Sequence, residues 1–137
     1  MKRIFADSNY FLALLNNRDE LHPRALEITP RFHDALVTTT WVLTEVLDAL
    51  CKPAHRELAA KFVRDLQSDP DILILPATQE LFMAGFEFFS KRPDKEWSLT
   101  DCISFVTMRE FGLTDALTAD RHFEQAGFQI LLGKDTN

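Results

Sequence analysis

The chain has 137 residues and a net charge of −6, with 46% hydrophobic and 26% charged residues. These values are typical of a single globular domain over residues 1–137, and they exclude a disordered chain or an overall basic nucleic-acid-binding surface. The two cysteines, Cys51 and Cys102, are not spaced as metal ligands, so we expect free thiols. No apolar run approaches the ~20 residues that span a bilayer. We therefore expect a cytoplasmic protein without membrane contact.

Short apolar segments alternate with helical patterns along the whole chain. In chain order, the patterns predict a strand over residues 3–6, helices over 8–16 and 20–29, a strand over 36–39, helices over 41–52 and 55–67, a strand over 71–75, helices over 78–90 and 99–111, a strand over 116–119, a helix over 122–126, a strand over 129–132 and a polar tail over 134–137. We expect Asp19 to cap the second helix, Pro53 to end the third and Gly112 to end the sixth. This alternation indicates an α/β fold around a mostly parallel sheet.

Four carboxylates stand in distinctive positions on this pattern. Asp7 and Asp120 each follow a predicted strand, Asp101 lies in the first turn of a helix, and Glu45 lies among apolar residues of another helix. Ligand sites in parallel sheets gather beyond the carboxyl ends of the strands. We therefore expect all four acids to face the same edge of the sheet.

Each acid also has an ordinary structural explanation. Asp7 and Asp120 suit the N-caps of the helices that follow them. Asp101 suits a capping box with Ser98, in the pattern Ser-x-x-Asp. Glu45 has apolar neighbours, although its helix can still offer a solvated face. Four separate capping or surface roles at one sheet edge would be a coincidence, so a shared metal site is the better interpretation.

Oxygen ligands of this kind suit a hard divalent cation such as Mg²⁺ or Mn²⁺. Asp48, one helical turn after Glu45, is a reserve ligand. The four histidines show no spacing for paired metal ligands, and we expect them at the surface or in packing contacts; they are His22, His33, His55 and His122.

The four acids stand in short motifs, which are Ile4-Phe5-Ala6-Asp7-Ser8-Asn9, Thr44-Glu45, Ser98-Leu99-Thr100-Asp101-Cys102 and Leu117-Thr118-Ala119-Asp120-Arg121-His122-Phe123. With these motifs the sequence resembles PIN-domain ribonucleases, and most closely the VapC-like toxins of prokaryotic toxin–antitoxin pairs. The similarity covers nearly the whole chain and keeps the family's order of acids. The resemblance implies a three-layer α/β/α sandwich with a central, mostly parallel sheet of about five strands.

The resemblance also implies metal-dependent hydrolysis of RNA by a site that holds Mg²⁺ or Mn²⁺. The family's catalytic acids carry over to Asp7, Glu45, Asp101 and Asp120, with Asp7 and Asp101 as the principal metal ligands. Small polar residues match positions beside the metal, where they would orient the carboxylates; they are Ser8, Asn9 and Thr118. Some members have a further acid after the fourth, for which Glu124 is the nearest candidate.

The partners implied by the resemblance are an RNA substrate, an antitoxin and a second copy of the chain. Transfer RNA is a common target in the family. The antitoxin would place a basic segment in the acidic groove. Trp41, Phe62 and the phenylalanine-rich residues 82–89 offer apolar surface for a homodimer or an antitoxin, although core packing explains most of them.

Two other functions remain as alternatives. A PIN-like domain can serve as a non-catalytic RNA-binding or protein-docking module, which loss of the acids would indicate, and none of the four is missing here. A haloacid-dehalogenase-type phosphatase also begins with an Asp after the first strand, but it needs a second Asp two residues later, where this chain has Asn9.

Overall fold

The computed structural model describes residues 2–29 and 34–133, which alternate between strands and helices as the sequence predicts. The elements in chain order are β1 (Arg3–Ala6), α1 (Ser8–Leu15), α2 (His22–Ile28), β2 (Ala35–Thr39), α3 (Thr40–Ala49), α4 (Pro53–Ser68), β3 (Ile72–Leu75), α5 (Gln79–Ser90), α6 (Leu99–Glu110), β4 (Asp115–Leu117), α7 (Arg121–Gln125) and β5 (Gln129–Ile130). The predicted polar tail over residues 134–137 lies outside the described residues.

The five strands form one sheet in the order β3-β2-β1-β4-β5, and every neighbouring pair is parallel. From β1 the chain adds β2 and β3 on one side, and then returns to add β4 and β5 on the other. The direction of strand addition therefore reverses between β1 and β4. At such a reversal the connections leave in opposite directions, and a crevice opens beyond the carboxyl ends of the two strands.

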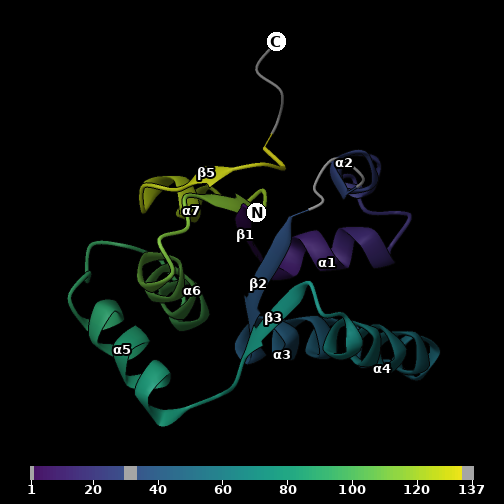
Figure 1. The fold of residues 1–137 in the computed structure, drawn as a ribbon, viewed down its shortest axis with the longest axis horizontal. Coiled ribbons are helices and arrows are strands. Elements are labelled where there is room, and N and C mark those ends of the chain that lie inside the picture. Colours follow the sequence, from purple (N-terminus) through teal and green to yellow (C-terminus); the bar gives the residue numbers. More distant parts are fainter. Residues whose placement is uncertain (1, 30–33, 134–137) are drawn as a thin grey trace.

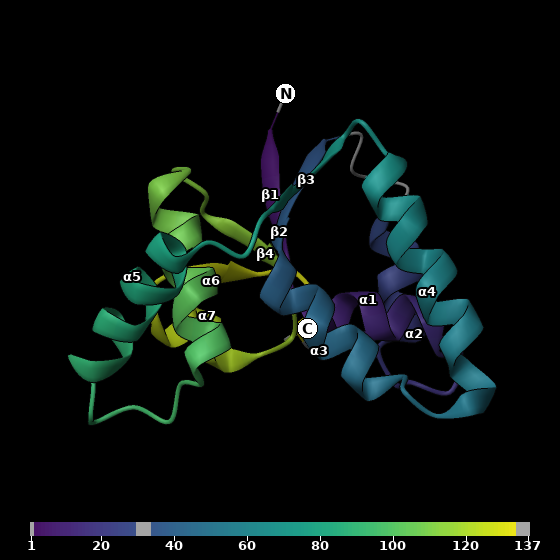
Figure 2. The same cartoon turned by 90° about the horizontal axis from the view of Figure 1, so that it is seen from below.

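Helices cover both faces of this sheet. Figure 1 and Figure 2 show α1 to α4 on one face and α5 to α7 on the other, with the sheet between them. The predicted three-layer α/β/α sandwich is confirmed. No helix in the described part of the chain is both long and apolar enough to cross a bilayer.

Side-chain caps fix where α3, α5 and α6 begin, and Asp120 caps α7 in the same way. The Thr39 hydroxyl accepts a hydrogen bond from the Val42 amide at the start of α3, and Thr78 does the same for α5. Ser98 and Asp101 form the predicted capping box at the start of α6. Each cap satisfies amide groups that the helix itself leaves without partners. The α6 cap matters most for function, because it sets the position of Asp101.

Some predicted boundaries are wrong. Asp19 does not cap α2: its carboxylate accepts from the Leu21 amide in the preceding turn, at 2.8 Å. Pro53 does not end α3, which stops at Ala49; it is the first residue of α4. Proline fits that position because the first amides of a helix have no intrahelical partner. The last strand covers only residues 129–130 rather than 129–132.

Glycine is required where α6 ends and where α5 meets α6. Gly112 follows α6 with a φ of +65°, in the left-handed region that glycine enters without strain, which confirms the predicted helix end. Gly85 of α5 lies so close to Ile103 of α6 that a β-carbon would overlap its side chain. The backbones of α5 and α6 therefore approach each other closely at Gly85.

An aromatic cluster in the core joins α6 to α7. The Phe105 ring packs edge to face on Phe123, with 4.9 Å between centroids, and on Trp97, with 5.1 Å. All three side chains are buried. Because α6 carries Asp101 and α7 follows Asp120, this packing also determines how these two acids face each other.

Candidate metal centre

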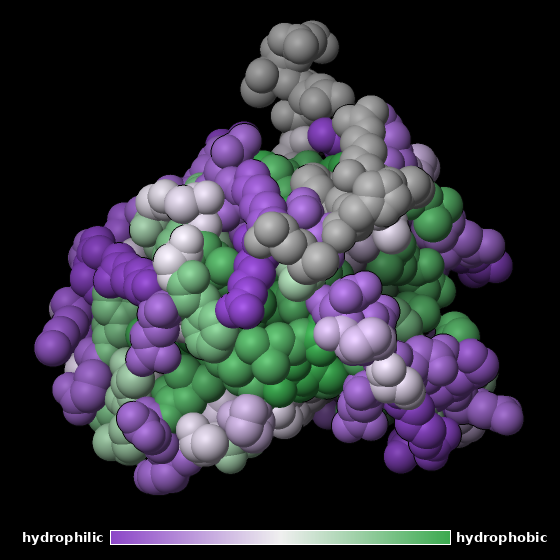
Figure 3. All heavy atoms as spheres, viewed as in Figure 1, coloured by the Kyte–Doolittle hydropathy of each residue, from purple (hydrophilic) through white to green (hydrophobic). Residues whose placement is uncertain are grey.

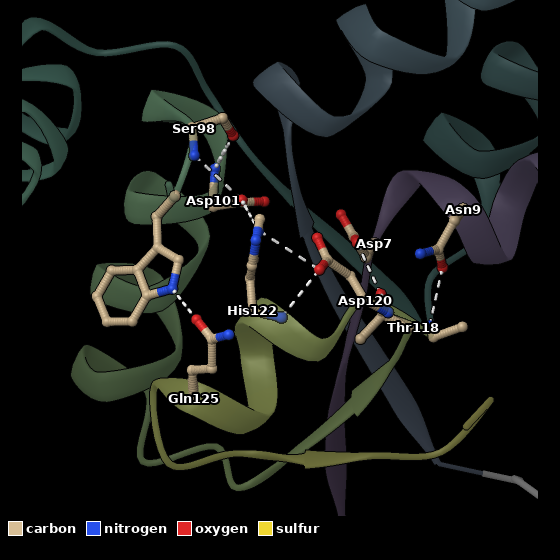
Figure 4. Close-up of polar contacts among 10 residues, drawn as sticks. Asp7, Asn9, Ser98, Asp101, Thr118, Asp120, His122 and Gln125 are labelled. Carbon is tan, nitrogen blue, oxygen red and sulfur yellow. Dashed lines mark hydrogen bonds and ion pairs between the residues drawn. The ribbon is translucent and has the colours of Figure 1, made fainter. Parts of the chain in front are cut away.

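The fold brings the four predicted acids to one edge of the sheet. Asp7 directly follows β1 and Asp120 caps α7 after β4, so these two flank the reversal point. Asp101 lies in the first turn of α6 and Glu45 in the second turn of α3. Figure 4 shows the side chains of Asp7, Asp101 and Asp120 approaching one another from these different elements.

Asp7 is the most buried of the four, with 5% of its surface exposed. One carboxylate oxygen, Oδ2, accepts a hydrogen bond of 2.8 Å from the Thr118 hydroxyl. Burial raises the pKa of Asp7 from 3.8 to about 7, opposed by its hydrogen bonds and assisted by the charges of Asp101 and Glu45. The residue holds the N-cap position of α1, but its side chain makes no capping hydrogen bond. Simple helix capping therefore does not explain this buried acid.

Two small polar side chains hold the loop after β4 against the start of α1. The Thr118 hydroxyl, which donates to Asp7, also accepts from the Asp120 amide at 3.1 Å. The Asn9 side-chain oxygen accepts from the Ala119 amide at 3.3 Å. The single Thr118 hydroxyl thus fixes Asp7 directly and Asp120 through its backbone.

Asp101 completes the α6 capping box and faces the other acids at the same time. Its Oδ2 atom accepts from the Ser98 amide at 3.1 Å and lies 3.1 Å from Nδ1 of His122. Burial and the charge of Asp120 raise the pKa of Asp101, while the contact with His122 lowers it. The capping and site interpretations of Asp101 are therefore compatible.

Glu45 is the most accessible of the four acids. Its carboxylate forms a hydrogen bond with the Ser8 side chain. Partial burial raises the pKa of Glu45, and the charges of Asp101 and Asp120 raise it further. Glu45 thus belongs to the same electrostatic cluster, on the side contributed by α3.

His122 also lies in this cluster, which the expectation of a surface or packing role did not anticipate. Its Nδ1 atom lies 3.1 Å from Asp101 and 3.5 Å from Asp120. The sequence offers one clue to this position, because His122 stands two residues after Asp120, an acid that caps a helix. By contrast, His22 contacts a backbone carbonyl of α1, and His33 lies outside the described residues.

The donor atoms fit a hard divalent cation. Within the described ranges, three residues bring ligand atoms within 4.8 Å of one another, namely Asp101, Asp120 and His122. Asp7 and Glu45 are not part of this tight group, although their charges interact with it. Several carboxylates that raise one another's pKa form an electrostatic arrangement that a cation relieves. The exposed side chains of Asp48 and Glu124 are not members of the tight group.

Comparisons with known proteins agree on one protein family. A family model described as the PIN domain matches residues 4–129. A curated protein of Mycobacterium tuberculosis, named 23S rRNA-specific endonuclease VapC20, is 28% identical over 126 residues, which are 91% of this chain and 95% of the relative. The same match is found in two strains of that organism.

Solved structures agree with the sequence matches. The crystal structure of M. tuberculosis VapC20, described as a sarcin–ricin loop cleaving toxin, superposes with a TM-score of 0.82 at 26% identity, covering 91% of this chain and 95% of the other. FitAcB from Neisseria gonorrhoeae has a TM-score of 0.67 at 17% identity, with 93% and 95% covered. VapBC2 from Rickettsia felis, bound to a promoter DNA fragment, has a TM-score of 0.66 at 11% identity. The match covers 93% of this chain and 96% of the other. The last two show a shared fold.

Proposed function

The chain belongs to the PIN-domain family, and we propose that it is a metal-dependent endoribonuclease that acts as the toxin of a toxin–antitoxin pair in the cytoplasm. The observation that carries this proposal is the cluster of four acids at the reversal point of the sheet. Asp7, Glu45 and Asp101 each have a raised pKa, and in each case the charge of another acid contributes. Such a cluster suits a cation and a phosphate substrate better than it suits a purely structural role.

Each residue of the site has a proposed role that follows from its position. Asp101 and Asp120 would hold a shared Mg²⁺ or Mn²⁺ ion through their carboxylate oxygens, and Asp7 would lie on the buried side of the site. When bound, the ion supplies a Lewis acid that lowers the pKa of water and offsets charge on the scissile phosphate. Glu45, which reaches solvent, would orient the attacking water and accept its proton. Ser8, Asn9 and Thr118 hold the acids or their backbone in place.

RNA is the proposed substrate, and ribosomal RNA is the first candidate because the relative with 28% identity is named as a 23S rRNA-specific endonuclease. Transfer RNA is the second candidate. The test is incubation of purified protein with each RNA in Mg²⁺, Mn²⁺ or EDTA, with cleavage sites mapped by primer extension. We expect cleavage only with added metal, and none from Asp7→Asn or Asp101→Asn.

The matched control for this test is Asp48→Asn, which removes an exposed acid of α3 and should leave cleavage unchanged. Equal cleavage by Asp7→Asn purified in parallel would refute the assignment, because the activity would then come from a contaminant. RNA binding without cleavage by the wild-type protein under all metal conditions would favour the non-catalytic module.

We further propose that an antitoxin inserts a basic segment into the acid cluster. The negative charge of the cluster suits Arg or Lys side chains, which would take the place of the cation. The test applies to any small protein found to be encoded beside this chain, which should inhibit cleavage. Inhibition should weaken when the basic residues of that protein are replaced by Ala, and undiminished inhibition would exclude this mode of binding.

A homodimer is the remaining part of the proposal, and α5 offers the surface for it. Three large apolar side chains of α5 are exposed, Met83 by 39%, Phe86 by 42% and Phe89 by 45%. Figure 3 shows apolar residues over a broad area of the face that carries α5 and β3. The three side chains expose on the order of 250 Å². This suits the centre of a dimer interface, which buries about 800 Å² per partner.

The charges along α5 favour an antiparallel pairing of two copies. Glu80 lies in the first turn of α5 and Lys91 follows its last residue. Rotation about a two-fold axis near Phe86 places Glu80 of one copy beside Lys91 of the other, and Phe86 against its own counterpart.

Light scattering after size exclusion tests this surface. We expect a dimer for the wild type and a monomer for Phe86→Glu. Leu58→Glu, at a side chain of α4 that is 49% exposed, is the matched control and should remain dimeric. A dimeric Phe86→Glu protein would exclude the α5 interface.

A further inference from the structure

His122 is the one non-acidic side chain in the tight group of possible ligand atoms within the described residues. The turn at the start of α7 directs it there. The His122 amide donates to Asp120 Oδ1 at 2.9 Å, so the backbone of the histidine is tied to the carboxylate beside it. Figure 4 shows the ring between Asp101 and Asp120, with Nδ1 toward both.

The distances from the His122 nitrogen to the two carboxylates suit ligands around one ion, and all three donor atoms lie within 4.8 Å of one another. Donors at about 2.1 Å from an octahedral ion are roughly 3.0 Å apart when adjacent and 4.2 Å apart when opposite. Nδ1 of His122 lies 3.1 Å from Asp101 Oδ2 and 3.5 Å from Asp120 Oδ1. Small side-chain rotations would therefore bring all three atoms to a shared ion.

We propose that His122 binds the active-site cation through Nδ1 and makes this a mixed nitrogen and oxygen site that selects Mn²⁺ over Mg²⁺. The inference rests on the proposed metal-dependent function and narrows it. Imidazole nitrogen binds transition-metal ions well, whereas Mg²⁺ prefers oxygen donors alone. The neutral ring would offer the Nδ1 lone pair while its proton resides on Nε2.

A further acid after Asp120 does not occupy this position. Glu124, the candidate from the sequence, is exposed and is not in the tight group. The donor atom that lies beside Asp101 and Asp120 is instead the nitrogen of His122. A nitrogen among oxygen donors is the reason to expect a metal preference different from that of an all-carboxylate site.

The main competing explanation is that His122 only joins α7 to α6 by its contacts with the two acids. A different contact already makes that connection. Trp97, which precedes α6, donates from its indole nitrogen to the side-chain oxygen of Gln125 in α7, at 2.9 Å. The buried packing of Phe105 on Phe123 joins the same two helices. The helices therefore do not depend on His122 for their attachment.

Electron spin-echo spectroscopy of the Mn²⁺-loaded protein separates the two explanations without any activity measurement. A directly bound imidazole gives ¹⁴N modulation of the Mn²⁺ echo, and a histidine that only contacts carboxylates gives none. We expect modulation in the wild type and in His55→Asn, which alters an exposed histidine of α4. We expect it to disappear in His122→Asn and in His122→Asp.

Calorimetric titration with Mn²⁺ and with Mg²⁺ gives the second readout. His122→Asn should bind Mn²⁺ at least about tenfold more weakly. His122→Asp restores a charged oxygen donor, so it should bind Mg²⁺ more tightly than His122→Asn while remaining without ¹⁴N modulation. Circular dichroism confirms that each variant is folded, and the two substitutions provide independent tests.

The outcomes distinguish this inference from the proposed function. Mn²⁺ binding with unchanged ¹⁴N modulation in folded His122→Asn would overturn the role of His122 and leave the metal-dependent function standing. An unchanged ratio of Mn²⁺ to Mg²⁺ affinity in His122→Asn would overturn the proposed selectivity. Failure of folded wild-type protein to bind either ion would overturn both proposals.

Discussion

Replacing Asp7 by Asn should stabilise the metal-free protein, and the gain should grow with pH. Burial raises the pKa of Asp7 from 3.8 to about 7, so the folded state binds this proton more tightly than the unfolded state does. The stability associated with the protonated carboxyl is therefore present at low pH and is lost as the pH rises from 3.8 to about 7. Asn keeps the shape of the side chain and can still accept from Thr118, but it never ionises.

The magnitude follows from the difference between the two pKa values. Each pH unit corresponds to about 1.4 kcal/mol, so ionised Asp7 destabilises the folded state by about 4 kcal/mol at pH 8. At pH 5 the carboxyl is protonated in the folded state, and the unfavourable contribution to stability falls to about 2 kcal/mol. Asp7→Asn should therefore gain roughly 2 kcal/mol more at pH 8 than at pH 5.

Urea denaturation in EDTA at both pH values measures this difference. Asp48→Asn is the control, because Asp48 is exposed and its replacement should have little effect at either pH. A gain for Asp7→Asn that is equal at the two pH values, or a loss at pH 8, would refute the reasoning. Saturating Mn²⁺ should reduce or reverse the advantage, because only the wild-type carboxylate gains from the ion.

Three further substitutions test the surroundings of the site. Thr118→Val removes a hydrogen bond that lowers the pKa of Asp7, so the metal affinity at pH 7 should weaken by roughly tenfold in calorimetry. Thr118→Ser keeps the hydroxyl and should retain the wild-type affinity. Equal metal affinities of the two variants would contradict this role of the hydroxyl. Gly85→Ala should lower the free energy of unfolding by about 1–3 kcal/mol because its β-carbon overlaps Ile103, and unchanged urea denaturation would argue against that close packing. Ser98→Ala removes a cap of α6 and should lower stability by about 1 kcal/mol, whereas Ser98→Thr should lower it less; equal losses would show that the hydroxyl is not the cause.

The arrangement of the acids could be predicted because it follows from topology. Asp7 and Asp120 come after strands, and the carboxyl ends of parallel strands share one edge. Asp101 was harder to interpret, since a capping box and a site role predict the same residue in the same place. The structure shows that one carboxylate oxygen of Asp101 serves the cap and also faces His122. Local sequence patterns therefore could not exclude either role.

His122 and the boundary at Pro53 show what the sequence could not provide. A lone histidine has no distinguishing partner in the sequence, and only the pairing of α6 with α7 places His122 beside Asp101. Proline is compatible with the end of one helix and with the start of the next, so the pattern alone could not choose for Pro53. Both positions depend on contacts or boundaries that the rest of the fold determines.

The hydrogen bond between Thr118 and Asp7 joins residues 111 positions apart in the chain. Translation proceeds from the N-terminus, so Asp7 and Glu45 leave the ribosome long before Thr118, Asp120 and His122 are synthesised. A nascent or truncated chain that ends before β4 lacks the Thr118 partner of the Asp7 carboxylate and has only part of the acid cluster. The acid cluster is therefore incomplete until most of this chain has been synthesised.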